Sequence, residues 1–141
     1  MPASEASIGL GTTFSYLSTA PSTYSIVGEA VSIQPPQPVR ETVDVTHLSS
    51  PDGTREFLGT LRDPGEAEVT FNFTDAAYEI VSDLFLEDDT QTFKITYPDG
   101  ATEVFSGIVT GKPSDAIEVD GVRRFSMPIK VTGLPVYTPA A

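Results

Sequence analysis

Asp44, His47 and the adjacent Ser49 and Ser50 are the residue types of a nucleophilic serine-histidine-aspartate triad, and they follow one another closely in the chain. In a triad the imidazole takes the serine proton while the carboxylate orients the imidazole, so all three groups need a rigid scaffold. Here they share one flexible connection between candidate strands. We therefore interpret His47 as a solvated loop histidine.

Glu87, Asp88 and Asp89 form the densest acidic run, and carboxylates of this kind bind hard cations. Cation loops space their ligands around a glycine bend, which this run lacks. The run also follows a predicted helix, whose C-terminal dipole disfavours negative charge. We interpret these acids as a solubility feature or as a contact with a partner.

Other catalytic patterns are incomplete. Gly9 and Gly11 lack the third glycine and the strand-to-helix setting of a dinucleotide site, and no phosphate-binding loop with its lysine occurs. No pair of carboxylates is singled out for glycoside chemistry. We expect no enzyme, no cofactor and no metal site.

The chain has 141 residues, of which 39% are hydrophobic and 20% charged, so we expect one soluble domain spanning residues 1–141. Cysteine is absent, which excludes disulfides and thiolate chemistry. Neither a basic leader nor an apolar run of about 20 residues is present, so we expect no membrane contact and synthesis in the cytoplasm.

The formal net charge is −12, from 20 acidic and 8 basic residues. Proteins that grip nucleic acid through its phosphates need clustered lysine and arginine, and such clusters are missing. The acidity indicates either solubility alone or a surface that faces DNA without binding it.

Alternating apolar residues and turn signals predict about six strands. The five clearest, in chain order, are Tyr24–Gln34 with Gly28 as a candidate bulge, Ala67–Phe73, Phe93–Tyr97 joined by Pro98-Asp99-Gly100 to Thr102–Thr110, and Phe125–Val131, preceded by a two-residue hairpin signal at Asp120-Gly121. Pro128 suggests an edge strand or a bulge.

One amphipathic helix is predicted after Thr74 or Asp75, either of which can cap it. Its apolar face consists of Ala77, Ile80, Val81, Leu84 and Phe85. We expect residues 1–22 to be a loosely ordered N-terminal arm, with a short extended piece around Thr12 to Leu17, and residues 133–141 to be an extended C-terminal arm.

The segment from Val39 to Gly65 is a long polar connection with a Pro51-Asp52-Gly53 turn in its middle. Unstructured connections of this length are uncommon in compact domains and usually carry a function. Extended pieces at Thr42–Leu48 and Arg55–Leu61 would make it an outstretched hairpin outside the core. The whole pattern favours a mainly β (α+β) fold, an antiparallel β-sandwich or partly open barrel with one flanking helix.

The segment from Thr92 to Gly107, TFKITYPDGATEVFSG, resembles the corresponding hairpin of the lambda-type siphophage major tail tube protein family. The order of features continues to match through Gly111-Lys112, an acidic turn and the strand end Lys130-Val-Thr-Gly. Upstream, VDVTHL, DGTREF and LRDPGE between Val43 and Glu66 resemble the long assembly loop of the broader tail tube family.

This resemblance implies a structural subunit of a bacteriophage virion, assembled in the host cytoplasm into stacked hexameric rings around an electronegative channel. Its implied partners are copies of itself, a tape-measure protein, the tail terminator and distal tail or baseplate proteins, and DNA passes through the channel at ejection without specific binding. Lambda's own subunit carries a further immunoglobulin-like domain. We expect this chain to be the tube domain only.

We expect the assembly loop, Val39 to Gly65, to contact the neighbouring ring, and both arms to contact neighbouring subunits. The candidate inter-subunit contacts are its charged residues, namely Arg40, Glu41, Asp44, His47, Arg55, Glu56, Arg62 and Asp63. Each Arg is equally well interpreted as solvated surface charge. Glu29 and Glu103 are candidate acids of the channel wall.

Three alternatives remain. The first is another virion or secretion-tube ring protein of related fold. The second is a β-sandwich binding module for carbohydrate or protein, which the absence of tryptophan disfavours. The third is a hydrolase, for which the sequence shows neither a base nor a pocket.

Overall fold

The computed structural model describes residues 4, 8–19 and 23–140, with nine strands, one α-helix and a short 3-10 turn. The elements are β1 (Thr13–Thr19), β2 (Thr23–Ile26), β3 (Ala30–Gln34), β4 (Val39–Asp44), the turn η1 (Pro51–Gly53), β5 (Phe57–Asp63), β6 (Glu66–Asn72), α1 (Asp75–Leu86), β7 (Gln91–Thr96), β8 (Thr102–Val109) and β9 (Arg124–Thr138). This is the mainly β fold with one helix that we predicted, with more strands than expected.

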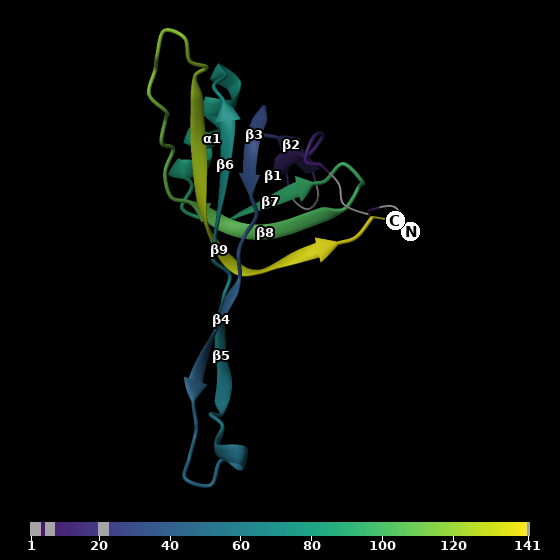
Figure 1. The fold of residues 1–141 in the computed structure, drawn as a ribbon. Coiled ribbons are helices and arrows are strands. Elements are labelled where there is room, and N and C mark those ends of the chain that lie inside the picture. The colour runs from purple at the N-terminus through teal and green to yellow at the C-terminus, as the bar shows by residue number, and fades with distance from the viewer. Residues whose placement is uncertain (1–3, 5–7, 20–22, 141) are drawn as a thin grey trace.

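Seven strands form one antiparallel sheet in the order β2-β1-β7-β8-β9-β6-β3 (Figure 1). The sheet curls so that Phe14 of β1 meets Phe71 of β6, with ring centroids 6.2 Å apart. Alternate residues of each strand fill the concave side, and Phe93, Phe105 and Phe125 are buried there. The result is a partly open barrel rather than a closed one.

Helix α1 packs against this core. Thr74 caps it, because the Thr74 Oγ1 accepts a hydrogen bond from the backbone N–H of Ala77. Ala77, Val81 and Leu84 are buried, as the helical spacing predicted. The prediction for Phe85 was wrong, since its side chain is exposed near the helix end.

The N-terminal segment is not a loose arm throughout. Residues Thr13–Thr19 form β1, which lies between β2 and β7 inside the sheet, and Phe14 is fully buried. The extended piece expected around Thr12 to Leu17 is thus present and belongs to the core. The rest of the predicted arm lies largely outside the described residues.

The single strand predicted over Tyr24–Gln34 is in fact two strands, β2 and β3, at opposite edges of the sheet. The link between them passes under α1 at Gly28, where a Cβ would lie 2.7 Å from the Cβ of Ala77. Only glycine allows this close approach. Gly28 is therefore a crossing point between the two edges rather than a bulge in one strand.

Strand β9 is an interior strand, so the edge predicted from Pro128 was wrong. The Pro128 carbonyl accepts a hydrogen bond from the backbone N–H of Thr110, just past the end of β8. Pro128 has no backbone N–H to donate, but its nitrogen faces the end of β8, where the pairing of β9 with β8 stops. The pairing of β9 with β6 is therefore unaffected. Beyond a bulge near Gly133, β9 continues to Thr138 along β8, so most of the predicted C-terminal arm is sheet.

Asp120-Gly121 does not form a two-residue hairpin. The backbone N–H of Gly121 bonds to the carbonyl of Glu118, but no strands pair on either side of the turn. Residues 110–123 instead form a long loop between β8 and β9, attached by a bridge between Ser114 and Phe125. Asp120-Gly121 thus lies in a turn, as its residue types predicted, but paired strands do not flank this turn.

Strands β4 and β5 form a separate two-stranded sheet that projects away from the barrel (Figure 1). They pair from Val39 opposite Asp63 to Asp44 opposite Phe57. The outstretched hairpin expected from the sequence is therefore confirmed.

Candidate assembly interface

The projecting hairpin, residues 39–63, has no layer of protein on either face. Every residue of β4 and β5 is exposed. Its exposed large apolar side chains are Val39, Val43, Val45, Leu48, Phe57, Leu58 and Leu61. An isolated two-stranded hairpin is only marginally stable in water, and this one also keeps apolar surface wet.

The register of the hairpin sorts these residues by face. Val43 lies directly opposite Leu58, so both point to the same side, and Asp44 opposite Phe57 points to the other side. Val45, one step further toward the tip, donates its backbone N–H to the Glu56 carbonyl and continues the Val43 side. One face therefore has an apolar strip, and the other is mixed.

The tip of the hairpin is organised by hydrogen bonds. The Ser50 hydroxyl donates to the Glu56 carboxylate at 2.7 Å, and the His47 Nε2 lies 3.3 Å from the same carboxylate. The His47 Nδ1 accepts the backbone N–H of Ser49. Neither serine hydroxyl donates to the imidazole in this arrangement, so the contacts hold the tip in shape rather than assemble a triad.

Asp44 and Arg55 already have partners within the hairpin. The Asp44 carboxylate lies 3.3 Å from the Arg55 guanidinium and also accepts the backbone N–H of Thr46. The hydrogen bonds from Thr46, and then from Arg55, lower the pKa of Asp44. These two residues stabilise the hairpin itself.

Arg40 and Arg62 differ from that pair. They are directly opposite one another in the register, and in the part of the chain that the structure describes neither has a carboxylate at salt-bridge distance. The Arg40 Nε donates to the Thr60 carbonyl at 3.2 Å, and its guanidinium lies over Gly59. Like charges placed directly opposite are destabilising.

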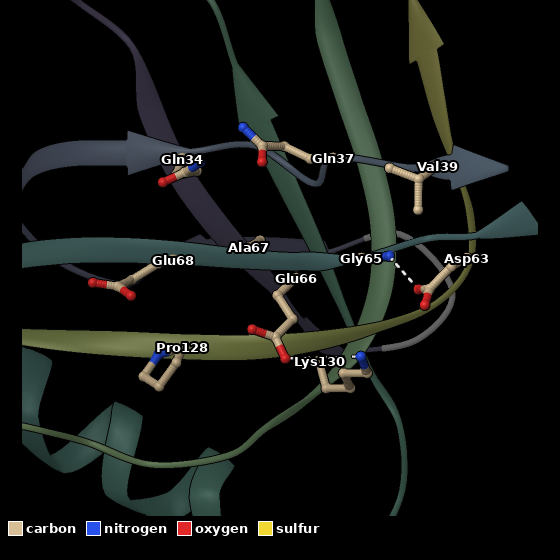
Figure 2. A pocket seen from close by; sticks show the side chains of 10 residues that line it. All are labelled: Gln34, Gln37, Val39, Asp63, Gly65, Glu66, Ala67, Glu68, Pro128 and Lys130. Atoms are coloured by element: carbon tan, nitrogen blue, oxygen red, sulfur yellow. Dashed lines mark hydrogen bonds and ion pairs between the residues drawn. The ribbon is translucent and has the colours of Figure 1, made fainter. Parts of the chain in front are cut away.

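A cavity of about 430 Å³ lies where the hairpin joins the barrel (Figure 2). Asp63, Glu66 and Glu68 bring three carboxylates to it, and the Lys130 Nζ lies 3.7 Å from Glu66. Gly65, with φ of +79°, turns the chain from β5 into β6. The hairpin therefore leaves the barrel from an acidic, sharply turned base.

Glu41 and Asp63 are both exposed near this base, and they line a smaller hollow with Leu61 and Arg62. The eight charged residues predicted as contacts thus spread along the whole hairpin. Four of them, Asp44, Arg55, His47 and Glu56, are paired within it.

The two predicted channel acids have different settings. Glu29 is exposed in the link between β2 and β3, and its carbonyl accepts the backbone N–H of Asn72. Glu103 is partly buried on the concave side and accepts the Tyr97 hydroxyl at 3.0 Å. Burial first, and then Glu103, raise the pKa of Tyr97 to about 12.

The contacts predicted for the hairpin were all charged residues and left out its exposed apolar residues. Val43 and Val45 alternate with Thr42 and Asp44, which is a strand signal present in the sequence. The acidic base at Glu66 and Glu68 was also missed, although both acids alternate with Ala67 and Val69.

No set of three or more His, Asp or Glu side chains in residues 4, 8–19 and 23–140 is arranged to hold a metal ion. Within the same residues, α1 is too short to count as a membrane-crossing helix, and no other candidate exists.

Comparison with known proteins gives matches to assembled tubes. A family model described as lambda phage tail tube protein matches residues 9–138. The tail of an empty gene transfer agent particle, solved with C6 symmetry, matches with a TM-score of 0.73 and 20% identity over 95% of this chain and 100% of that one. A search of curated sequences found no significant match.

Two further solved structures share the fold. A chain of the anti-feeding prophage baseplate matches with a TM-score of 0.74 and 7% identity, over 96% of this chain and 97% of that one. The SPP1 tail tube matches with a TM-score of 0.63 and 14% identity, over 92% of this chain and 77% of that one.

A curled sheet with one flanking helix places the chain in a fold class that also includes chains of solved tails and of a baseplate. Within this class, the match over residues 9–138 is decisive: the chain belongs to the lambda phage tail tube protein family. It is a structural subunit of a phage tail tube and a component of the virion tail.

Proposed function

We propose that copies of this protein assemble into hexameric rings, that the rings stack into a hollow tail, and that the β4–β5 hairpin of each subunit contacts the next ring. The sixfold symmetry of the similar gene transfer agent tail supports the ring number. Self-association also supplies partners for the free edges of β2 and β3, which would otherwise invite uncontrolled pairing.

The exposed hairpin is the observation that carries this proposal. Seven large apolar side chains lie exposed on it. Burying one such side chain fully contributes about 1.5 to 3 kcal/mol, so covering even part of this set outweighs the surface ion pairs, each worth about 0 to 1 kcal/mol. The hairpin therefore gains most of its stability from a neighbour.

In this proposal the charged residues of the hairpin fix the orientation and register of the apolar contact. In the proposal Arg40, Glu41, Arg62 and Asp63 face the neighbouring subunit near the hairpin base. Asp44, His47, Arg55 and Glu56 act indirectly, because their pairs fix the shape of the outer hairpin. Charged groups of this kind specify orientation more than they add affinity.

The channel is proposed to be acidic, so that DNA is repelled by the wall and slides through. The net charge of −12 per subunit supports this, since a ring of six copies would carry a strongly negative total charge. Glu29, exposed in the link between β2 and β3, fits a wall position. Glu103 fits it less directly, because Tyr97 occupies its carboxylate.

The remaining partners follow from the place of a tube in a virion. We propose a tape-measure protein inside the tube during assembly, a terminator at one end and baseplate proteins at the other. The part played by the chain itself is contact, without catalysis, and the hydrogen bonding at His47 supports this because Glu56 lies where a serine would be needed.

Negative-stain microscopy of concentrated protein tests the proposal, with a variant in which residues 42–60 are replaced by a short glycine-serine turn. The intact protein should form hollow filaments. The variant should keep a cooperative melting transition, because the barrel core lies outside the hairpin, yet form no filaments. Normal filaments from the variant, or dispersed monomers of the intact protein at all concentrations, contradict the proposal.

A further inference from the structure

The hairpin and the β8–β9 loop, residues 110–123, lie at opposite ends of the molecule (Figure 1). Along the β6–β9 ladder, Glu66 pairs with Lys130 at the end that carries the hairpin, and Asn72 pairs with Arg124 at the end that carries the loop. A ladder of this length separates the two by roughly 20 Å. In a head-to-tail stack, opposite ends of successive copies meet.

The outer part of the β8–β9 loop is held at both ends and projects between them. The backbone N–H of Ser126 bonds to the Pro113 carbonyl, and that of Asp115 to the Arg124 carbonyl. On the return side the Arg123 guanidinium lies 3.9 Å from the centre of the Phe73 ring. The projecting residues between these anchors are 116–122.

This projecting part alternates apolar and acidic residues, Ile117, Glu118, Val119 and Asp120. Val119 is 102% exposed and Ile117 72% exposed, although both are strand-forming residues that normally seek burial. Residues 118–121 form a turn, closed by the Gly121 N–H to the Glu118 carbonyl, so acidic and apolar side chains are neighbours at the tip of the loop. The loop tip thus offers acidic and apolar side chains at once.

The hairpin base offers the complementary set. Arg40 and Arg62 are opposite each other with no carboxylate partner among the described residues, and Leu61 beside them is 87% exposed. A carboxylate placed between the two guanidiniums would remove their repulsion. The hairpin from Val39 to Leu48 spans roughly 30 Å, enough for it to run alongside a second copy while its base meets the end of that copy.

We propose that the β8–β9 loop of one subunit docks on the hairpin base of a second copy in the adjacent ring, with Glu118 and Asp120 at Arg40 and Arg62, and Ile117 and Val119 at Leu61. This inference rests on the proposed stacking of rings. It specifies which surface of the neighbouring subunit receives the hairpin base. The contact is then heterologous, because it joins two different surfaces at opposite ends of the subunit.

The competing acidic segment is Glu87, Asp88 and Asp89 after α1. It lies beside β1 and the helix end, where Glu87 lines a hollow with Tyr16 and Leu84, away from the loop end of the barrel. It has no alternating apolar residues to cover Leu61. This run therefore supplies a control of matched charge.

Charge reversal tests the pairing. Arg40→Glu with Arg62→Glu, and separately Glu118→Arg with Asp120→Arg, should each raise the protein concentration needed for filaments about tenfold or more. Combining the two sets in one chain, which exchanges the charges of the two surfaces, should restore filaments. Arg40→Glu and Arg62→Glu combined with Asp88→Arg and Asp89→Arg, a change of the same charge, should not. Equal rescue by the control, or no rescue by the loop reversal, overturns the pairing.

Engineered cysteines give a second test, which is clean because the chain has no cysteine of its own. Oxidised filaments of a Leu61→Cys, Val119→Cys chain should run as a ladder of covalent multimers, whereas a Leu61→Cys, Leu86→Cys chain should not. Filaments of both chains with no ladder, or with equal ladders, overturn the loop contact and leave ring stacking intact. If the unmodified protein forms no filaments, the stacking itself fails.

Discussion

Gly65 shows how one residue sets the direction of the whole hairpin. Its φ is +79°, and a Cβ there would lie 2.5 Å from the Gln37 carbonyl oxygen. Left-handed backbone costs a non-glycine residue about 1 to 2 kcal/mol, and the collision with backbone adds to it. At Gly133, φ is +76° and no atom lies within 4 Å of the corresponding Cβ, so strain acts there without a collision.

We therefore expect Gly65→Ala to lower the free energy of unfolding by more than the about 1 to 2 kcal/mol expected for Gly133→Ala. Urea unfolding of both variants, followed by circular dichroism at concentrations where the protein is dispersed, measures the difference. Equal losses for the two variants would show that the chain at Gln37 gives way easily, and that Gly65 does not fix the hairpin base.

Tyr97 makes a prediction about alkaline stability. Its folded-state pKa of about 12 is above the usual value of 10, because burial and the Glu103 carboxylate both disfavour the phenolate. The stabilisation is fully present below pH 10, where the phenol is protonated in both states, and is lost as pH rises toward 12. Tyr97→Phe should remove this part of the pH dependence.

The measurement is the unfolding free energy between pH 9 and 12, compared for the intact protein and Tyr97→Phe. Glu103→Gln is the matched control, since it keeps the phenol and removes the charge beside it. It should shift the tyrosinate absorbance of Tyr97 to lower pH. An unchanged pH profile in Tyr97→Phe would contradict the assignment.

Strand β1 is the element in which local sequence and tertiary structure differ most. Phe14 stacks on Phe93, with ring centroids 5.6 Å apart, and is fully buried although its surroundings are rich in serine and threonine. Removing a buried Phe side chain costs about 3 to 5 kcal/mol. We expect that loss for Phe14→Ala, and less than about 0.5 kcal/mol for the exposed Ile8→Ala.

Thermal and urea unfolding of these two variants decide whether β1 is integral to the domain. A Phe14→Ala protein as stable as Ile8→Ala would mean that the N-terminal segment is the dispensable arm that its composition suggests.

The elements that were predictable from sequence are those whose own residues alternate. Strand β6 and the first half of β9 have strict period-two patterns, and Pro98-Asp99-Gly100 marks the turn between β7 and β8. The place of β1 could not be predicted, because its ladder with β7 joins residues as far apart as Thr13 and Thr96. Local pattern carries no information about such pairing.

The same reason explains the errors between β2 and β3. The residues from Tyr24 to Gln34 form extended backbone on both sides of Gly28, as the pattern predicted, but each half pairs with a different strand. For the interface, the length of the hairpin was predictable from its polar composition. Which charges have internal partners depends on register, which the bulge between Arg40 and Thr42 shifts.

The apolar strip on one face of the hairpin, which contains Val43 and Leu58, gives a second prediction at the level of an element. Val43→Ser with Leu58→Ser should leave the unfolding of the barrel unchanged, since both side chains are exposed in the subunit, and should raise the concentration needed for filaments about tenfold or more. Leu86→Ser, on an exposed apolar residue of α1, is the control and should assemble normally. Sedimentation of filaments over a concentration series measures both; equal behaviour would exclude the strip from the contact.

At the scale of the whole molecule, the net charge bears on the proposed passage of DNA through the tube. With 20 acidic and 8 basic residues, a tube of this protein should not retain double-stranded DNA even at low ionic strength, where electrostatic attraction is strongest. The assembled state matters here, because the proposed stacking would bring the acidic wall residues of many subunits around one channel.

The position of Glu29 can be tested through this property. If Glu29 lines the channel, Glu29→Lys places one basic group per subunit on the wall, and short labelled DNA should then sediment with the filaments at low salt and be released as salt rises. Asp52→Lys makes the same charge change at the hairpin tip, where residues 51–53 are exposed. It should retain no DNA, because that site is proposed to be covered by the next ring. DNA retention by both variants alike would show that net charge alone governs binding and would remove Glu29 from the wall.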